Sequence, residues 1–305
     1  MQPNSTAHGV APPLIPPSTG LSAHDARRFM MTICLASVTG PMNFSMLSVA
    51  LPSIADDLDI SVATGAWLFV VPSLASSSLQ SIGGRLGDVF GYRRMFMIGA
   101  FGFILASVLT ALAPTFWALV AGRVLIMIGS SAMQRNTGAL VRVHMPAARR
   151  ASAFGTMAAS ISLAFAAGPL IGGALVATVG WRALFVVAVP FTLVAILLSL
   201  RWIPPDPPHE SSRRSLDGVG ALLWTLSVIA IVLPINLGGN GTLSPLALLL
   251  VYLGTGMLLF AFIGWELRQA EPVVQVRLFL TRTFRSAALS EASMNVTFFT
   301  IALAL

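Results

Sequence analysis

Long apolar segments separated by short polar stretches make up most of this 305-residue chain. Each segment is close to the roughly 20 residues that an α-helix needs to cross the hydrocarbon core of a bilayer. The pattern therefore predicts an all-α, multi-pass membrane protein. The expected spans lie at residues 29–54, 62–84, 94–113, 115–141, 152–178, 182–202, 218–237, 244–266 and 286–305. Residues 1–28 lack periodicity and are expected to form a disordered tail.

The composition agrees with a membrane environment and excludes several functions. Hydrophobic residues make up 56% of the chain, charged residues only 10%, and the mean hydropathy is +0.84. A soluble domain of this length could not hide so much apolar surface. The chain has no GxxxxGK[ST] phosphate loop, and its histidines are scattered in predicted tails and loops, at His8, His24, His144 and His209. We therefore expect no enzyme activity, no metal site and no cofactor.

The arginines lie in alternate loops and so predict the orientation of the chain. The basic loops hold Arg27, Arg28, Arg85, Arg93, Arg94, Arg142, Arg149, Arg150, Arg201, Arg213, Arg214, Arg268, Arg277, Arg282 and Arg285. The opposite loops hold three aspartates and only one arginine, Arg182. Because basic loops stay on the cytoplasmic side, we expect a cytoplasmic N-terminus in the cell (cytoplasmic or inner) membrane. Topology rather than nucleic-acid binding then explains the net charge of +7.

The segment after the second expected span is rich in glycine and arginine. It reads Gly84-x-Leu86-x-Asp88-x-x-Gly91-x-Arg93-Arg94. We expect a tight turn here, with Asp88 placed to meet nearby arginines or a helix N-terminus. The pattern resembles the cytoplasmic loop between helices 2 and 3 of major facilitator superfamily transporters. The resemblance implies that Gly84, Asp88, Gly91, Arg93 and Arg94 control closure of the transport path on the cytoplasmic side.

A second copy of this pattern lies further along the chain. Residues 82–86 and 91–96 correspond to residues 171–175 and 180–185, at a constant offset because 171 − 82 = 89 and 180 − 91 = 89. Three expected spans separate the copies, so the copies fall on opposite sides of the membrane. This arrangement predicts an inverted repeat of three plus three helices within a six-helix unit at residues 29–202.

Polar side chains in the first and fourth spans are candidates for a cavity lining. Asn43 stands where similar drug:proton antiporters usually carry an acidic residue, and an amide cannot bind and release a proton. It contacts either a ligand or a neighbouring helix. A mid-membrane arginine such as Arg123 needs a wet cavity or a partner. It either forms a polar stripe with Ser130 and Gln134, or bonds backbone carbonyls as a structural residue; Arg135 is expected to reach toward the inner surface.

The fifth span and the segments after it narrow the resemblance. Gly168-Pro169-Leu170-Ile171-Gly172-Gly173 is similar to the antiporter motif of exporters, which implies that Gly168, Pro169, Gly172 and Gly173 shape a bending helix. A linker at residues 203–217, two helices at 218–266 and a loop at 267–285 resemble the central part of fourteen-span drug exporters. Residues 286–305 then resemble the first helix of a second half, which implies that the sequence is truncated. Glu291 in that helix is a possible titrating group.

The resemblance implies secondary active multidrug efflux by proton antiport, with alternating access to the two sides. The expected partners are the lipid bilayer, a drug-like small molecule and protons, but no nucleic acid. A periplasmic adaptor is left open. Two alternatives remain: a facilitator for a specific metabolite or anion, or a membrane partner protein that does not transport.

Overall fold

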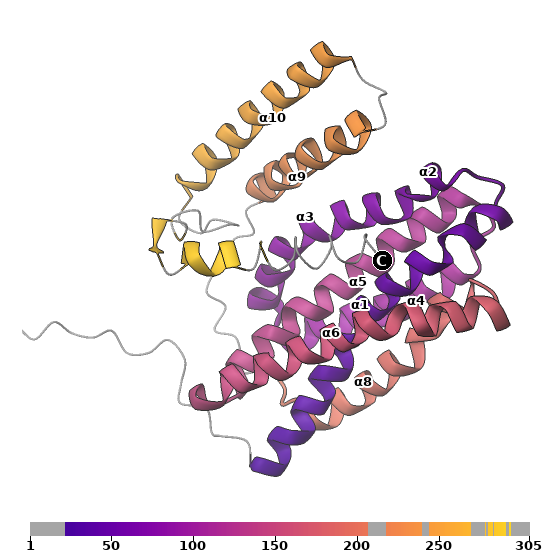
Figure 1. Ribbon diagram of the computed structural model, residues 1–305. Helices are drawn as coiled ribbons and strands as arrows, with labels where there is room; N and C mark the ends of the chain where they lie inside the picture. The colour runs from indigo at the N-terminus through magenta and orange to yellow at the C-terminus, as the bar shows by residue number, and fades with distance from the viewer. Residues whose placement is uncertain are drawn as a thin grey trace, which may run out of the picture.

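The computed structural model describes residues 22–206, 218–239 and 244–269, followed by residues 278, 280–282, 284–290 and 293. Every regular element within these residues is a helix (Figure 1). Glu291 and most of the expected span at 286–305 lie outside the described residues, as do most of the linker at 203–217 and of the loop at 267–285.

Six long helices and two short ones form the first unit. They are α1 (Ala23–Asp57), α2 (Val62–Gly65), α3 (Trp67–Phe90), α4 (Tyr92–Ala111), α5 (Phe116–His144), α6 (Ala147–Thr178), α7 (Ala183–Val186) and α8 (Ala188–Trp202). The order of spans agrees with the prediction, but α1 begins inside the expected disordered tail. Ser22 explains this start, because its hydroxyl accepts a hydrogen bond from the backbone N–H of Asp25 at 3.2 Å and so caps the helix.

The glycine-rich segment at residues 84–94 is mostly helical, and our prediction of a turn there was wrong. Helix α3 continues through Asp88 to Phe90, and α4 begins at Tyr92. Gly91 alone reverses the chain, with φ of +97°. A residue without a Cβ adopts this conformation readily, so one glycine replaces a longer loop.

Helix packing follows the predicted inverted repeat. If α1, α3 and α4 correspond to α5, α6 and α8, then the pair α1–α6 corresponds to α5–α3, and the pair α4–α5 corresponds to α8–α1. All four pairs are in contact. The equivalent glycines of the two copies, Gly91 and Gly180, also share a positive φ, at +97° and +99°. The two halves of the unit are therefore built alike, although their sequences agree only in short segments.

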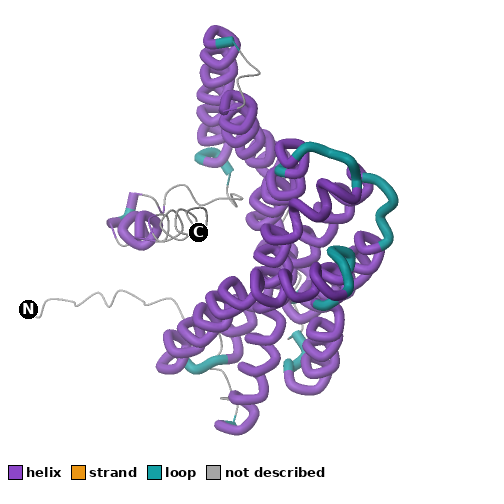
Figure 2. Tube along the Cα trace, turned by 45° about the vertical axis from the view of Figure 1, so that its right-hand side comes forward, coloured by secondary structure: helices purple, strands orange, loops and turns teal. Residues whose placement is uncertain are grey.

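Two further helices form a hairpin beside the six-helix unit. Helix α9 (Gly218–Gly239) packs against α3, and α10 (Pro245–Glu266) packs against α9 (Figures 1 and 2). The hydroxyl of Thr255 in α10 donates a hydrogen bond to the carbonyl oxygen of Ala230 in α9 at 2.9 Å. Long apolar side chains such as Met257 and Phe260 remain more than three quarters exposed on α10, as expected for a helix that faces lipid.

Candidate functional site

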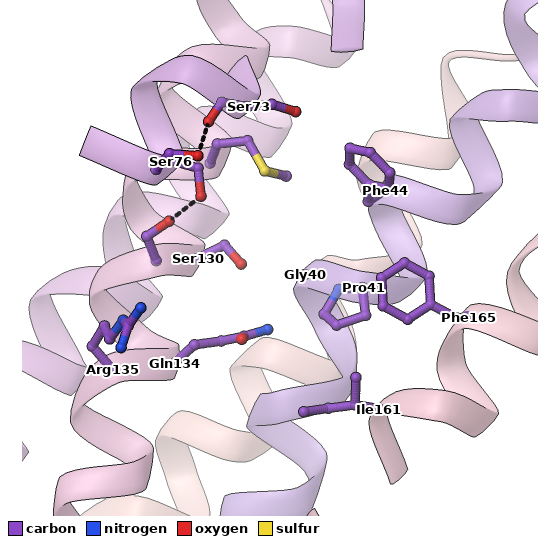
Figure 3. Close-up of a pocket in the computed structure, with 13 residues that line it drawn as sticks. Gly40, Pro41, Phe44, Ser73, Ser76, Ser130, Gln134, Arg135, Ile161 and Phe165 are labelled. Atoms are coloured by element: carbon purple, nitrogen blue, oxygen red, sulfur yellow. Dashed lines mark hydrogen bonds between the residues drawn. The ribbon is translucent and has the colours of Figure 1, made fainter. Parts of the chain in front are cut away.

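A cavity of about 680 Å³ lies between two helix pairs of the six-helix unit. Helices α1 and α6 supply one wall, and helices α3 and α5 supply the other (Figure 3). These pairs are the ones that the inverted repeat relates to each other. The cavity therefore lies between elements that correspond to each other in the two copies of the repeat, and transporters built from repeats bind substrates at repeat interfaces. Its volume is within the range of about 300–1,000 Å³ for small-molecule sites.

The wall from α1 and α6 is apolar and largely aromatic. Phe44 and Phe165 pack edge to face, with ring centroids 6.4 Å apart and an interplanar angle of 76°. Pro41 and Ile161 extend this wall toward the other end of the cavity (Figure 3). Such rings offer a large, rigid surface to a flat apolar molecule.

The wall from α3 and α5 is polar. Its polar side chains are Ser73, Ser76 and Ser77 of α3 and Ser130, Ser131, Gln134 and Arg135 of α5, and Met127 of α5 adds one apolar side chain. The hydroxyl oxygens of Ser76 and Ser131 lie 2.8 Å apart and hydrogen-bond across the two helices. Ser130 and Gln134 line the cavity, and Gln134 extends toward the opposite wall at Gly40.

Arg135 also lines this cavity, although helical periodicity placed it on a different face of α5 from the polar stripe. Consecutive residues on a helix differ by about 100° around its axis, so the sequence separates Gln134 from Arg135. A long, flexible side chain can cover that angle, and both residues meet at the same end of the cavity (Figure 3). Within the part of the chain that the structure describes, Arg135 is the one charged residue that lines the cavity.

Asn43 and Arg123 form a separate buried pair that does not line the cavity, although we had named both as cavity candidates. Nη1 of Arg123 donates a hydrogen bond to Oδ1 of Asn43 at 2.5 Å. Nδ2 of Asn43 donates in turn to the carbonyl oxygen of Leu184 at 3.2 Å. Arg123 is 0% exposed and Asn43 is 1% exposed. The pair joins α5, α1 and α7 inside the packed unit.

The basic segment at the α3–α4 junction is held by a residue that sequence reasoning missed. Both oxygens of the Asp206 carboxylate accept hydrogen bonds from the first turn of α4, from the backbone N–H of Arg93 at 2.9 Å and that of Arg94 at 3.1 Å. Asp88, which we expected to meet an arginine or a helix N-terminus, instead accepts a hydrogen bond from the hydroxyl of Tyr92. Asp206 follows two prolines in the linker, where no local pattern indicates a partner on α4.

The glycines of α6 lie where this helix crosses α1. A Cβ on Gly168 would overlap the hydroxyl of Ser45, and one on Gly172 would lie 3.0 Å from the carbonyl oxygen of Met46. Gly173 has more space, because its nearest neighbour would be Val49 Cγ1 at 3.7 Å. Pro169 is exposed, and α6 continues through it. Gly168 and Gly172 thus allow the close approach of two helices.

Among the described residues, no group of three or more histidine, cysteine, aspartate or glutamate side chains could hold a metal ion. The polar groups of the cavity are hydroxyls, one amide and one guanidinium. These groups can bind a small molecule by hydrogen bonds and charge.

Comparison with known proteins finds relatives that are all transporters of one superfamily. The sequence pattern of the Major Facilitator Superfamily matches residues 33–302. The chain is 32% identical to YwoD, an MFS-type transporter of Bacillus subtilis, over 88% of this chain and 59% of the relative. It is 30% identical to the multidrug efflux pump LfrA of Mycolicibacterium smegmatis, over 90% and 54%. It is also 30% identical to the tetracenomycin C resistance and export protein of Streptomyces glaucescens, over 87% and 48%.

Solved structures agree on the fold. A bacterial homologue of the lysosomal transporter Spinster superposes with a TM-score of 0.55 at 20% identity, over 69% of this chain and 52% of that one. A peptide transporter crystallised with sulfate superposes with a TM-score of 0.56 at 18% identity, over 83% of this chain and 56% of that one. This chain thus spans about half of the length of the relatives it matches.

Proposed function

Because the chain belongs to the Major Facilitator Superfamily, whose members here are transporters and not enzymes, we propose that it binds cargo for a proton-driven exporter of drug-like aromatic molecules. The observation that carries this proposal is the two-sided cavity between α1–α6 and α3–α5. Its aromatic wall and its hydroxyl-rich wall suit a flat amphipathic molecule. Two relatives, the multidrug efflux pump LfrA and the tetracenomycin C resistance and export protein, support export of drug-like molecules.

Alternating access requires that the α3–α4 junction moves as a unit with the helices it joins. The clamp between Asp206 and the first turn of α4, and the bond between Tyr92 and Asp88, give this junction a defined shape. We assign Gly84, Asp88, Gly91, Arg93 and Arg94 to closure on the cytoplasmic side, with the N-terminus in the cytoplasm. We also assign α9 and α10 to the two additional central helices of the fourteen-span exporters.

Proton coupling has to come from a group other than Asn43. The amide of Asn43 does not titrate and is committed to Arg123 and Leu184. Glu291 is our candidate, because it lies inside a segment that we expect to cross the membrane, whereas Glu266, the other carboxylate in the expected spans, is the last residue of its span. Each charge that moves down 100 mV releases about 2.3 kcal/mol, which is enough to drive uphill export.

The test uses everted membrane vesicles that contain the protein and an uncharged aromatic dye, Nile red. An imposed pH gradient, acidic inside, should drive dye uptake, and a protonophore should abolish it. Uptake that ignores the protonophore would remove the proton-antiport claim, and failure to move Nile red would remove aromatic cargo. Competition by unlabelled metabolites in the same vesicles separates a multidrug exporter from a facilitator for one specific metabolite or anion.

Three variants examine the assigned roles in the same assay. Asp88→Asn should lower uptake while the protein still inserts, and Tyr92→Phe, which removes only the hydroxyl partner, should lower it less. Glu291→Gln should uncouple uptake from the pH gradient. Normal uptake by Asp88→Asn would contradict a gating role for this carboxylate.

A further inference from the structure

We propose that the cavity selects neutral or anionic aromatic molecules over cationic ones, with Arg135 as the residue that determines this specificity. This inference rests on the proposed function, since it concerns the cargo of the same cavity. It names the charge of the cargo, which neither the fold nor the family determines.

The first support is the separation of chemistry between the two walls. Phe44 and Phe165 face the hydroxyls of α3 and α5 across the cavity (Figure 3). A flat cargo molecule can place its ring face against the phenylalanines only if its polar edge points to the opposite wall. That edge then meets the serine hydroxyls, Gln134 and Arg135. The arrangement of the two walls therefore determines which part of the cargo contacts the polar wall.

The second support is the nature of the groups on the polar wall. A guanidinium is a donor only, and serine and glutamine side chains can also donate. Donors are matched by acceptors such as carboxylate, phenolate, quinone or amide oxygens. A cationic edge, which offers donors alone, would leave the guanidinium of Arg135 facing another positive group.

The third support is the distribution of charge in the six-helix unit. Among the described residues that line the cavity there is no carboxylate. The described aspartates of this unit lie near helix ends, at Asp25, Asp56, Asp57, Asp59, Asp88 and Asp206. Of the arginines within α5, Arg135 lines the cavity, and Arg123 is fully buried elsewhere in the packed unit. Coulomb interactions are strong in a medium of low dielectric constant, so the positive interior favours an anion.

The test compares two xanthene dyes that share a ring system but differ in charge. Fluorescein is anionic and rhodamine 123 is cationic. The purified protein is placed in nanodiscs of zwitterionic phosphatidylcholine, so that lipid charge does not bias the result, and binding is followed by fluorescence anisotropy. Empty nanodiscs give the background. We expect fluorescein to bind at least about tenfold more tightly than rhodamine 123, which is the effect of about one hydrogen bond to a charged group.

Matched variants locate the preference. Arg135→Gln should weaken fluorescein binding about tenfold and leave rhodamine 123 binding equal or tighter. Arg142→Gln removes the same charge two turns further along α5, outside the cavity, and should leave the preference intact. Phe165→Leu should weaken both dyes, whereas Phe154→Leu, also on α6 but outside the cavity, should weaken neither.

Two results would overturn the inference: equal or tighter binding of rhodamine 123 by the unaltered protein, or an unchanged preference in Arg135→Gln. Transport of Nile red distinguishes failure of the charge selection from failure of the proposed function. If Nile red is moved but the anionic dye is not preferred, only the charge selection is wrong. If Nile red is not moved and neither dye binds, aromatic cargo itself is wrong.

Discussion

The carboxylate of Asp206 occupies the space that a side chain on Gly91 would need. A Cβ on Gly91 would overlap this carboxylate, whose two oxygens accept hydrogen bonds from the backbone of Arg93 and Arg94. The linker after α8 is thereby attached to the junction between α3 and α4. The sequence separates these segments by more than 100 residues, as Arg93 and Asp206 are 113 apart.

Removal of the Asp206 carboxylate should destabilise the protein. Asp206→Ala leaves two N–H groups at the start of α4 without their partner, and loss of such a cap costs about 0.5–2 kcal/mol. Asp206→Asn should cost less, because asparagine caps helices about as well as aspartate. Thermal unfolding in detergent measures the difference. Asp56→Ala is the control, since Asp56 is exposed at the end of α1; an equal loss in the two alanine variants would disprove the cap.

Gly91 and Gly180 separate backbone strain from steric overlap. Both have a φ near +100°, at +97° and +99°, so alanine at either position should cost about 1–2 kcal/mol in strain. Only at Gly91 does the new methyl group also meet Asp206, because nothing lies within 4 Å of a Cβ on Gly180. Gly91→Ala should therefore lower the unfolding temperature more than Gly180→Ala.

A double variant checks the cause of this difference. In an Asp206→Ala background the carboxylate is gone and only the Cβ of residue 206, at 3.1 Å, remains beside a Cβ on Gly91, so most of the excess cost of Gly91→Ala over Gly180→Ala should disappear. An excess that persists in this background would show that the overlap with Asp206 is not its source.

Truncation of the buried Asn43 side chain should lower the stability of the protein. Asn43→Ala removes the oxygen that accepts a hydrogen bond from the buried Arg123 guanidinium, and it leaves the carbonyl of Leu184 without the amide donor of Asn43. Loss of a hydrogen bond to a buried charged group costs about 1.5–3 kcal/mol. Ser48→Ala, on an exposed position of the same helix, is the control in a thermal unfolding series. A loss at position 43 no larger than at position 48 would contradict the role of the pair in packing.

The adjacent glycines Gly172 and Gly173 should respond in opposite directions to alanine. A methyl group at Gly172 meets the backbone of Met46 at 3.0–3.1 Å, which a main chain cannot easily relieve, so α1 and α6 must separate. At Gly173 the nearest atom is at 3.7 Å, and alanine favours a helix over glycine by up to about 1 kcal/mol. Unfolding temperatures should fall for Gly172→Ala and stay level or rise for Gly173→Ala. If Gly173→Ala lowered the unfolding temperature more than Gly172→Ala, the close contact with α1 would not be at Gly172.

The candidate site was only partly accessible to sequence reasoning. Ser130 and Gln134 were found because they lie near one face of a helix, and helical periodicity reveals a common face. The same reasoning misplaced Arg135, because periodicity locates the Cα atom and not the end of a long side chain. It also grouped Arg123 with the cavity, although Asn43 takes this side chain into the packed interior. No local pattern could assign Asp206 to α4, since its partners are backbone N–H groups, which every helix start offers.

The sequence by itself determined the membrane environment, the order of the spans and the inverted repeat. These properties depend on the length of apolar segments, which the bilayer thickness dictates, and on short motifs that recur at a constant offset. The tertiary structure alone decided which polar residues face a cavity and which are buried as pairs. It also decided that one glycine, rather than an eleven-residue turn at 84–94, joins α3 to α4. Such outcomes depend on side-chain reach and on contacts between distant segments, and hydrophobic periodicity contains no information about either.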